Sequence, residues 1–284
     1  MNRQPAQRFQ LQDGAALDQA TGLTWSLDAN PAEWPLFWSE ARAFMARLNR
    51  RGHLGFTDWR LPGRREIFSL IDYAQANPAL PPGHPFGNLE LAWYWTATTY
   101  AGNQAHAWCL HLEGGRMFPG DKGRSYYAWP VRGASRVLPA TGSSDEPAIG
   151  RAWPAPRWQA KEGAVLDRLS GLLWTQRADL APGPVNWFAA AGVVERLNQR
   201  RHAGRGDWRL PAIQELELLV DASRAFPALP ADAPFGQVRP QYWSATTSGF
   251  DPDWAMALYL DKGGIGVGMK KGPHYHVWAV SEGG

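Results

Sequence analysis

Residues 58–62 read Asp58-Trp59-Arg60-Leu61-Pro62, and residues 207–211 repeat them as Asp207-Trp208-Arg209-Leu210-Pro211. The two stretches lie 149 positions apart (207 − 58 = 149). The same offset relates other residues of the two halves, namely His53 to His202, Leu48-Asn49 to Leu197-Asn198, Glu66 to Glu215 and Trp25 to Trp174. Agreement over this length indicates a tandem duplication, so the chain contains two copies of one domain.

The repeated pentapeptide predicts a structural element rather than a catalytic one. Trp59 brings a large apolar area to a core. On an extended segment, Asp58 and Arg60 point away from that core, where they can pair with each other or hold loops. Pro62 fixes the backbone ahead of the next element. We therefore predict a structural role for the tryptophans and their charged neighbours in both copies: Trp25, Asp58, Trp59, Arg60, Trp174, Asp207, Trp208 and Arg209.

The offset divides the 284 residues into two domains of ordinary size. We place the first domain at residues 6–134 and the second at residues 155–284, and each is long enough to form its own core. Residues 135–154 are rich in Ala, Pro, Ser and Gly, which predicts a linker.

Composition narrows the functional classes. The formal net charge is only +3, whereas a dedicated nucleic-acid binder typically has a concentrated basic face, so we do not expect nucleic acid as a partner. The single cysteine, Cys109, excludes an intramolecular disulfide framework and cysteine-rich metal sites. Neither a secretory signal nor a membrane-spanning run is present in the sequence as given. We expect a cytoplasmic protein, with a surface location or export by another route left open.

The order of elements predicts an α+β fold. Alternating residues at 8–12 and a short run at 23–25 indicate strands, and the spacing of apolar residues in 38–48 indicates a helix. Glu66 marks the start of a second helix. A proline-rich loop follows, then a meander of strands with a Gly-Gly hairpin turn. The second copy repeats this order, so we expect two helices and a mainly antiparallel, twisted sheet with long loops in each domain.

These motifs together resemble a known family. Each copy has Thr/Ser-Gly-Leu-x-Trp, a helix ending in Leu-Asn, Asp-Trp-Arg-Leu-Pro with Glu four residues later, and Tyr-Trp-[Ser/Thr]-Ala-Thr-Thr. A Gly-Gly hairpin, a Lys and a final aromatic-x-Val strand follow. The pattern is similar to the DUF1566 domain, also called the C-terminal domain of the Legionella collagen-like adhesin. The resemblance implies a C-type-lectin-like fold in two tandem copies, with paired N- and C-terminal strands and a general binding role in a bacterial or phage setting. It implies no catalytic residue.

The sequence departs from the family pattern after Leu-Pro, where family members usually have a helix-capping Thr or Ser. Gly63 and Ala212 stand at these positions, which predicts weaker capping of the second helix of each copy. The calcium-binding motifs of sugar-binding C-type lectins are also absent, so any sugar recognition is expected to be calcium-independent.

No residue set predicts catalysis or a bound cofactor. Cys109 has no counterpart in the second copy and fits a small buried apolar residue better than a nucleophile. The His274-Tyr275-His276 segment places two imidazoles on one strand face, but no carboxylate cluster adjoins them, so we predict no metal site. We therefore expect a protein that is not an enzyme and has no cofactor.

Arginines cluster around the helix junction of each copy. In the first copy they are Arg47, Arg50, Arg51, Arg60, Arg64 and Arg65, and in the second they are Arg196, Arg200, Arg201, Arg205 and Arg209. They could bind a sulfated glycan or nucleic acid, or they could be a solvated helix face paired with carboxylates. The small net charge favours the second interpretation.

The last strands and loops of the copies differ while the framework residues agree, as in a binding fold whose copies recognise different ligands. This zone contains residue types that anchor interfaces. The predicted ligand-binding residues are Asn103, His106, His111, Arg116, Phe118, Arg124 and Tyr126 in the first copy, and Phe250, Asp251, Asp253, Trp254, Tyr259, His274 and His276 in the second. We expect a non-enzymatic recognition protein for an unknown protein or glycan, with an anionic polymer as the alternative. The resemblance also suggests the hypothesis that a diversity-generating retroelement diversifies this region.

Overall fold

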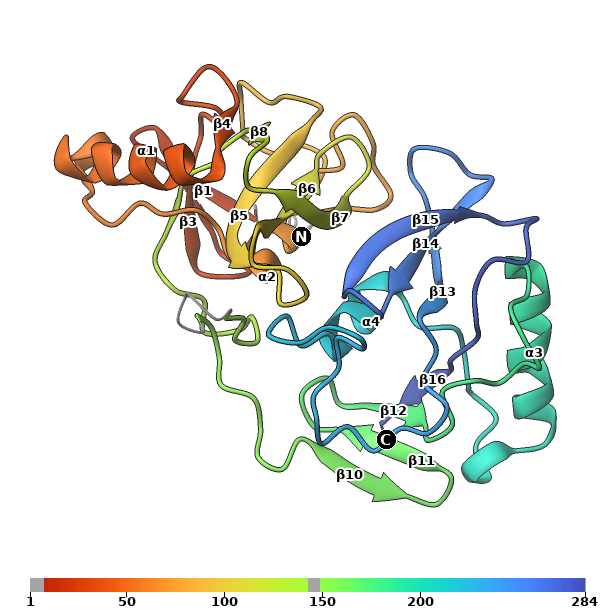
Figure 1. The fold of residues 1–284 in the computed structure, drawn as a ribbon. Coiled ribbons are helices and arrows are strands. Elements are labelled where there is room, and N and C mark those ends of the chain that lie inside the picture. The colour runs from red at the N-terminus through yellow and green to blue at the C-terminus, as the bar shows by residue number, and fades with distance from the viewer. Residues whose placement is uncertain (1–7, 143–148, 284) are drawn as a thin grey trace, which may run out of the picture. The chain divides into compact units, whose positions relative to one another are not determined.

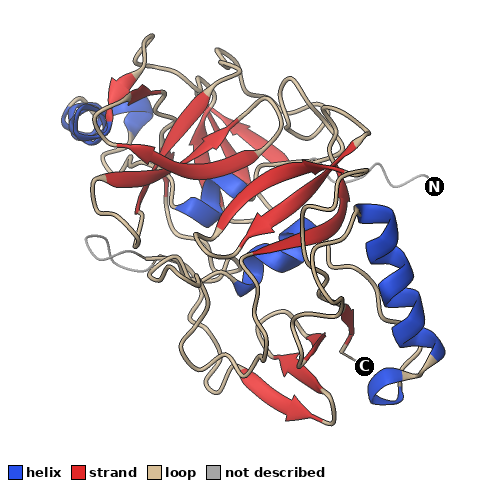
Figure 2. Ribbon diagram, turned by 45° about the vertical axis from the view of Figure 1, so that its right-hand side comes forward, coloured by secondary structure: helices blue, strands red, loops and turns tan. Residues whose placement is uncertain are grey.

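The computed structural model describes residues 8–142 and 149–283. The chain forms two compact units, Met1–Ala152 and Trp153–Gly284. Each unit contains one copy of the repeat, and both mix helices with antiparallel sheet (Figures 1 and 2). The division between the units falls inside the segment 135–154 that the composition marks as a linker. In that segment, residues 139–141 bridge to 149–151.

A four-stranded sheet joins the beginning and the end of each copy. In unit 1 its order is β1-β2-β3-β9, and in unit 2 it is β10-β11-β12-β16, with all neighbours antiparallel. The expected pairing of N-terminal with C-terminal strands is therefore confirmed, and the contact is made by the third strand of each copy, β3 or β12. The strands are β1 (Phe9–Gln12), β2 (Ala15–Asp18), β3 (Leu23–Ser26) and β9 (Val131–Arg132), and β10 (Trp158–Lys161), β11 (Ala164–Asp167), β12 (Leu172–Thr175) and β16 (Val280–Glu282).

A second sheet in each unit is a meander of three strands, and its register is continuous except for a break in the first strand. In unit 1 a two-residue strand pair, β4 with β8, adjoins it. The strands are β5 (Trp93–Thr99), β6 (His106–His111), β7 (Arg116–Asp121), β4 (Leu36–Phe37) and β8 (Ser125–Tyr126) in unit 1, and β13 (Gln241–Thr247), β14 (Trp254–Tyr259) and β15 (Gly264–Met269) in unit 2.

Two α-helices and one 3₁₀ turn complete each unit. The long helix buries the apolar face that its sequence spacing predicts, including Trp38, Ala41 and Met45. The second helix of unit 1 is short and ends at Phe68. The helices are α1 (Trp38–Arg50), η1 (His53–Gly55) and α2 (Arg64–Phe68), and α3 (Trp187–Gln199), η2 (His202–Gly204) and α4 (Ile213–Leu219).

Buried tryptophans connect the layers at matching positions in both units. The Trp129 and Trp278 side chains are fully buried and donate Nε1–H to the carbonyl oxygens of Ser26 and Thr175, each over 3.0 Å. Trp95 and Trp243 each donate to a carbonyl oxygen ahead of the long helix over 2.8 Å. Each of these four indoles therefore combines a large buried apolar area with a satisfied donor, which fits their recurrence at matching positions in the two copies.

An asparagine near the end of the long helix holds the backbone of the pentapeptide in position. Asn49 accepts from the backbone N–H of Trp59 over 2.7 Å and donates to its carbonyl oxygen over 2.9 Å. Asn198 binds the backbone of Trp208 with the same two distances. These hydrogen bonds explain why an asparagine recurs at this position in both copies.

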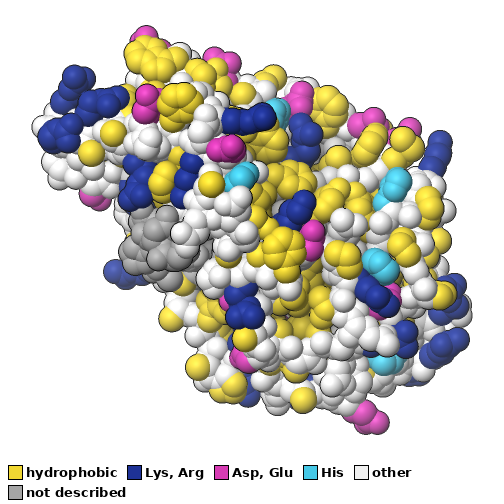
Figure 3. Space-filling model, in the orientation of Figure 1, with side chains coloured by type: hydrophobic (Ala, Val, Ile, Leu, Met, Phe, Trp, Pro, Cys, Tyr) yellow, Lys and Arg dark blue, Asp and Glu magenta, His cyan; other side chains and the backbone are white. Residues whose placement is uncertain are grey.

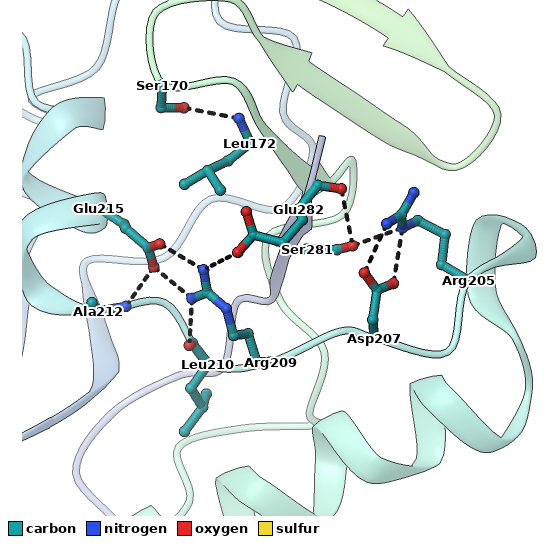
Figure 4. A network of polar contacts seen from close by, with 10 residues as sticks. All are labelled: Ser170, Leu172, Arg205, Asp207, Arg209, Leu210, Ala212, Glu215, Ser281 and Glu282. Carbon is teal, nitrogen blue, oxygen red and sulfur yellow. Dashed lines mark hydrogen bonds and ion pairs between the residues drawn. The ribbon is translucent and has the colours of Figure 1, made fainter. Parts of the chain in front are cut away.

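The charged residues of the pentapeptide hold other segments and do not pair with each other. Arg60 binds the carboxylate of Glu66 in a bidentate pair of 2.6 and 2.7 Å. In unit 2, Arg209 binds Glu215 over 2.7 Å and also reaches Glu282 on the last strand (Figure 4). Each arginine thus ties the second helix to the chain that precedes it, and planar guanidinium–carboxylate geometry suits this role.

The aspartates of the pentapeptide bind different arginines in the two units. Asp58 pairs with Arg132 on β9 at 2.7 Å. Asp207 instead pairs with Arg205, only two residues away, and Arg205 also donates to the Ser281 hydroxyl on β16 (Figure 4). In both cases the contact secures the final strand.

The predicted weakness of helix capping is wrong, because a strand supplies the missing hydroxyl. Thr98 Oγ1 accepts the backbone N–H of Arg64 over 3.0 Å, and Thr246 Oγ1 accepts that of Ile213 over the same distance. The Glu66 and Glu215 side chains accept the N–H groups of the N-cap residues, Gly63 and Ala212. The orphan donors at both helix N-termini are therefore shared between two partners.

Candidate functional site

The predicted ligand-binding residues fall into two groups, because side chains alternate along a strand. One group lies on the side of the meander that carries Trp95 or Trp243, and we call this the sheet face. The other group lies where the turn before β6 or β14 meets the end of β7 or β15. We call this the loop end, and it comprises residues 100–105 and 121–125 in unit 1, and 248–253 and 269–274 in unit 2.

In unit 1 the sheet face holds four of the predicted residues around Trp93. His111 packs edge-on against Trp93 at 4.8 Å, and the Arg116 guanidinium lies 5.9 Å from that ring. Tyr126 packs against Trp95 at 4.5 Å. The fourth residue, Phe118, lies opposite Cys109.

Charge on this face is partly compensated. Glu113 lies 3.6 Å from Arg116 and 3.8 Å from His111. Burial lowers the pKa of His111, the Arg116 charge lowers it further, and Glu113 opposes both effects. The imidazole is therefore held toward its neutral form, which suits a hydrogen-bonding residue better than a fixed cation.

The matching face of unit 2 is uncharged and tightly packed. Tyr259 stands where unit 1 has His111, and its hydroxyl lies 2.5 Å from the Tyr275 hydroxyl. Tyr275 in turn packs against Trp243 at 4.6 Å, and its ring would collide with any side chain at Gly268. The sheet faces of the two units therefore share a framework and differ in chemistry.

His276 is removed from this face. It lies on the opposite side of the chain from Tyr275, and its Nδ1 is 3.2 Å from the carboxylate of Asp179. Asp179 is buried and also binds Arg239 over 2.7 Å. These contacts hold the loop that carries Asp179, so the geometry gives His276 a structural role.

The loop ends carry the exposed members of the predicted set. Asn103 and Arg124 are exposed in unit 1, and His106 is half-buried at the start of β6. In unit 2, Asp253 and His274 are exposed, and Asp251 and Trp254 are half-buried. Phe250 has 55% of its surface exposed, so it presents an apolar surface beside these polar residues.

Additional exposed aromatic residues adjoin the loop ends, and the sequence analysis missed them. In unit 1, Phe37 is 45% exposed on β4, where it pairs with Ser125, and Trp34 is 59% exposed three residues earlier. In unit 2, Phe188 is 56% exposed in the first turn of α3. Figure 3 shows hydrophobic side chains exposed on the part of unit 1 that carries β4. The sequence signal was present in the Trp34-Pro35-Leu36-Phe37 run, because Gly183 and Asn186 stand at the positions of Trp34 and Phe37 in the second copy.

A clamp of three residues fixes the base of each loop end. The Lys122 ammonium lies 4.0 Å from the centre of the Trp38 ring and donates to Thr99 Oγ1 over 2.8 Å. Unit 2 repeats the arrangement with Lys270, Trp187 and Thr247, at 4.6 and 2.8 Å. The repeated Lys therefore has a structural partner set, and the variable side chains project from a rigid base.

The arginine clusters do not form one surface in either unit. Arg60, Arg205 and Arg209 are paired with carboxylates, and Arg64 and Arg65 are buried. What remains accessible is the group near the C-terminal ends of the long helices. Figure 3 shows basic side chains gathered over α1. The exposed members are Arg47, Arg50 and Arg51 in unit 1 and Arg196, Arg200 and Arg201 in unit 2.

The chemistry of the candidate reactive groups is that of a structural framework. Among residues 8–142 and 149–283, no three His, Cys, Asp or Glu side chains converge in a way that could hold a metal ion. The Cys109 thiol is buried, burial raises its pKa well above the ordinary range, and it donates to the carbonyl oxygen of Phe118. A thiol held in this state is a poor nucleophile.

The two units thus define a class: duplicated α+β domains with a fixed tryptophan framework and divergent loop ends. Both match the family model of the Lcl C-terminal domain, at residues 14–132 and 163–281. The matched regions are offset by 163 − 14 = 149 residues, which is the offset of the pentapeptide. The chain belongs to this family and carries its domain twice. A comparison with curated proteins found no match. None of the helices in the described part of the chain is long and apolar enough to cross a membrane.

Proposed function

We propose that this protein is a non-enzymatic recognition module that binds a protein or glycan through the loop ends of its two domains. The family of the Lcl C-terminal domain supports a ligand-binding or adhesin-like role. The observation that carries the proposal is the exposure of large aromatic side chains beside each loop end: Trp34 and Phe37 in unit 1, and Phe188 and Phe250 in unit 2. Exposed aromatic residues of this kind anchor interfaces.

The two loop ends offer different chemistry beside their aromatic residues. Unit 1 presents Arg124 and Asn103, whereas unit 2 presents Asp253 and His274. Two domains that present different polar and charged side chains on one framework suit two ligands, or two parts of one ligand. If one ligand spans both sites, the second contact forms at a high effective concentration and avidity follows.

The proposed fold assignment is C-type-lectin-like, and the proposed binding is independent of calcium and of any cofactor. Paired terminal strands and long loops support the assignment. The absence from the sequence of the calcium-binding motifs of sugar-binding C-type lectins supports calcium independence. Binding should therefore be unchanged when EDTA is added.

The experiment is a glycan and protein array probed with the intact chain and three double variants. Trp34→Ser with Phe37→Ser removes the aromatic anchors of unit 1, and Phe188→Ser with Phe250→Ser removes those of unit 2. Leu11→Ser with Leu91→Ser is the matched control, because these residues are 62% and 47% exposed but lie outside the loop ends. We expect at least one loop-end variant to lose about tenfold or more in affinity, since anchor residues commonly contribute more than about 1.4 kcal/mol. Equal losses in the control and the loop-end variants would contradict the proposal.

An anionic polymer is a second candidate, supported by the exposed arginines at the end of α1 and α3. Retention on heparin should then fall steeply with salt, because each neutralised charge on a polymer releases a counterion. Replacing Arg47, Arg50 and Arg51 by Gln should shift elution to lower salt. Retention that does not depend on salt would discard this candidate.

Diversification of the loop ends by a retroelement is a further part of the proposal. It is supported by the agreement of the framework and the divergence of residues 248–253 from 100–105. The test is the genomic DNA beside the gene. A near-copy of the final coding segment next to a reverse transcriptase would support it, and the lack of both would exclude it.

A further inference from the structure

Unit 2 has a groove that lies away from its loop end. The cavity measures about 710 Å³ and runs between the C-terminal part of α3 and the loops at residues 176–182 and 236–237. This volume is in the range of small-molecule sites. Its lining residues are Gly163, Gln176, Arg177, Leu180, Ala181, Pro182, Leu197, Arg200, His202, Gly236 and Gln237.

Comparison of the two copies shows which side chains this groove lacks. Unit 1 has an apolar and an acidic side chain in the equivalent region, and unit 2 has neither. At the 149-residue offset, Ala203 replaces Leu54. In unit 1 a Leu54 methyl carbon lies 2.6 Å from the position that a Cβ on Gly14 would occupy, so Leu54 covers this glycine. In unit 2 the nearest atoms to the same point on Gly163 are the His202 ring, at 3.3 Å, and the Ala203 Cβ, at 3.8 Å. A branched apolar group is therefore missing beside Gly163.

A negative charge is missing as well. Unit 1 has Asp28, whose carboxylate accepts from Asn88 over 2.9 Å. Unit 2 has Arg177 and Gln237 at these positions, so a cation replaces the carboxylate. Arg177 donates through Nε to the carbonyl oxygen of Asp179 over 2.7 Å, while the Asp179 carboxylate is taken by Arg239 and His276. Within the described residues, the terminal nitrogens of Arg177 have no partner.

The other charged residues that line the groove are also basic. Arg200, at the end of α3, is exposed, and its side chain makes no polar contact with any described residue. None of the lining residues is acidic, whereas Arg177, Arg200 and His202 can all carry positive charge. The His202 ring is held in place by Nε2, 3.0 Å from the Gly163 carbonyl oxygen, and by packing on Trp208. Leu180 and Leu197 supply an apolar floor that continues into the core of the unit.

We propose that this groove binds a small organic carboxylate with a short branched apolar body. The apolar body replaces the missing Leu54 equivalent against Leu180 and Leu197, and the carboxylate binds the terminal guanidinium nitrogens of Arg177 and the guanidinium group of Arg200. Guanidinium groups favour carboxylates because two parallel N–H donors match the two oxygens. A small carboxylate fits better than a polymer, because the lining combines the apolar Leu180 and Leu197 with cationic side chains in a cavity of about 710 Å³.

The test uses the full chain and 4-methylpentanoate as the probe, with 4-methylpentanamide as its uncharged match. Binding is measured by isothermal titration and ligand-observed NMR at low salt, where exposed charges are least screened. We expect the acid to bind with a dissociation constant on the order of 1 mM and the amide to bind about tenfold more weakly, as the loss of a charge-assisted bond implies. Equal binding of acid and amide, or no binding of the acid, would overturn the proposal.

Three variants locate the site. Ala203→Leu restores the side chain of unit 1 and should abolish binding by filling the groove. Arg177→Gln should weaken binding of the acid about tenfold and leave that of the amide unchanged. Arg168→Gln is the control, because Arg168 is exposed in unit 2 but does not line the groove. The affinity of this variant for 4-methylpentanoate should stay within about twofold of that of the parent chain. Retained binding in Ala203→Leu, with a thermal transition like that of the parent, would contradict the assignment.

Discussion

The strand threonine that caps α4 offers a sharp test of how the repeat is held together. Thr246→Val keeps the shape of the side chain and its preference for a strand, but it removes the oxygen that lies 3.0 Å from the Ile213 backbone nitrogen. Ile213 is fully buried, so water cannot replace the lost acceptor without opening the structure. The Ala212 side chain has no hydroxyl to take over.

The magnitude follows from the cost of losing a helix cap and leaving a buried N–H unpaired. Both considerations give about 1–2 kcal/mol. For a domain of this size, such a loss lowers the melting temperature by roughly 3–8 °C. Thr246→Ser keeps the hydroxyl and should cost clearly less. Thr98→Val should repeat the effect in unit 1, because Thr98 caps Arg64 over the same 3.0 Å.

The assay is urea unfolding followed by far-ultraviolet circular dichroism, combined with hydrogen exchange of the peptide that contains Ile213. Thr246→Val should lose protection at the start of α4 before the rest of unit 2 does. The reasoning is refuted if Thr246→Val and Thr246→Ser agree in unfolding free energy to within about 0.3 kcal/mol, which is less than any measured cap contribution of this kind.

Three further predictions concern packing, pH and the thiol. Gly268→Ala should destabilise unit 2 by about 1–3 kcal/mol, because the added Cβ would collide with the Tyr275 ring. Gly183→Ala is the control and should be neutral, because no atom lies within 4 Å of its added Cβ. Equal melting temperatures of the two variants would contradict this prediction. Burial lowers the pKa of His53 and His84 as well as that of His111. Below the ordinary histidine pKa of about 6.5, the unfolded chain therefore binds more protons than the folded chain. Stability from these residues is therefore present above pH about 6.5 and lost as pH falls below it, and a His53→Gln variant should show a smaller loss in denaturant titrations at pH 7.5 and 5.5. Cys109 should resist a thiol reagent at pH 8 in the folded chain and react at once in guanidinium chloride; rapid reaction without denaturant would show that the thiol is accessible.

The sequence predicted the duplication and the framework because these depend on spacing within one chain. The 149-residue offset fixed the repeat, and the apolar spacing of Trp38, Ala41 and Met45 predicted the buried face of α1. The pairing of the terminal strands came from the family resemblance. By contrast, the cap from Thr98 joins residues 34 positions apart, and no local pattern reports such a contact.

The candidate site was predicted only in part, because strand alternation decides which residues share a face. His106 and His111 lie on one strand but five positions apart, so they point to opposite sides and cannot act together. His276 was grouped with the ligand residues, yet it pairs with the buried Asp179 from a distant loop. Phe37 was overlooked because its exposure depends on the short β4–β8 pairing, which no repeat pattern reveals.

Hydrogen exchange of the intact chain with and without a ligand found on the arrays tests the recognition proposal most directly. The account predicts new protection at residues 100–105 and 121–125, or at 248–253 and 269–274, with the four-stranded sheets unchanged. Protection confined to β1 and β2, or to β10 and β11, would contradict it.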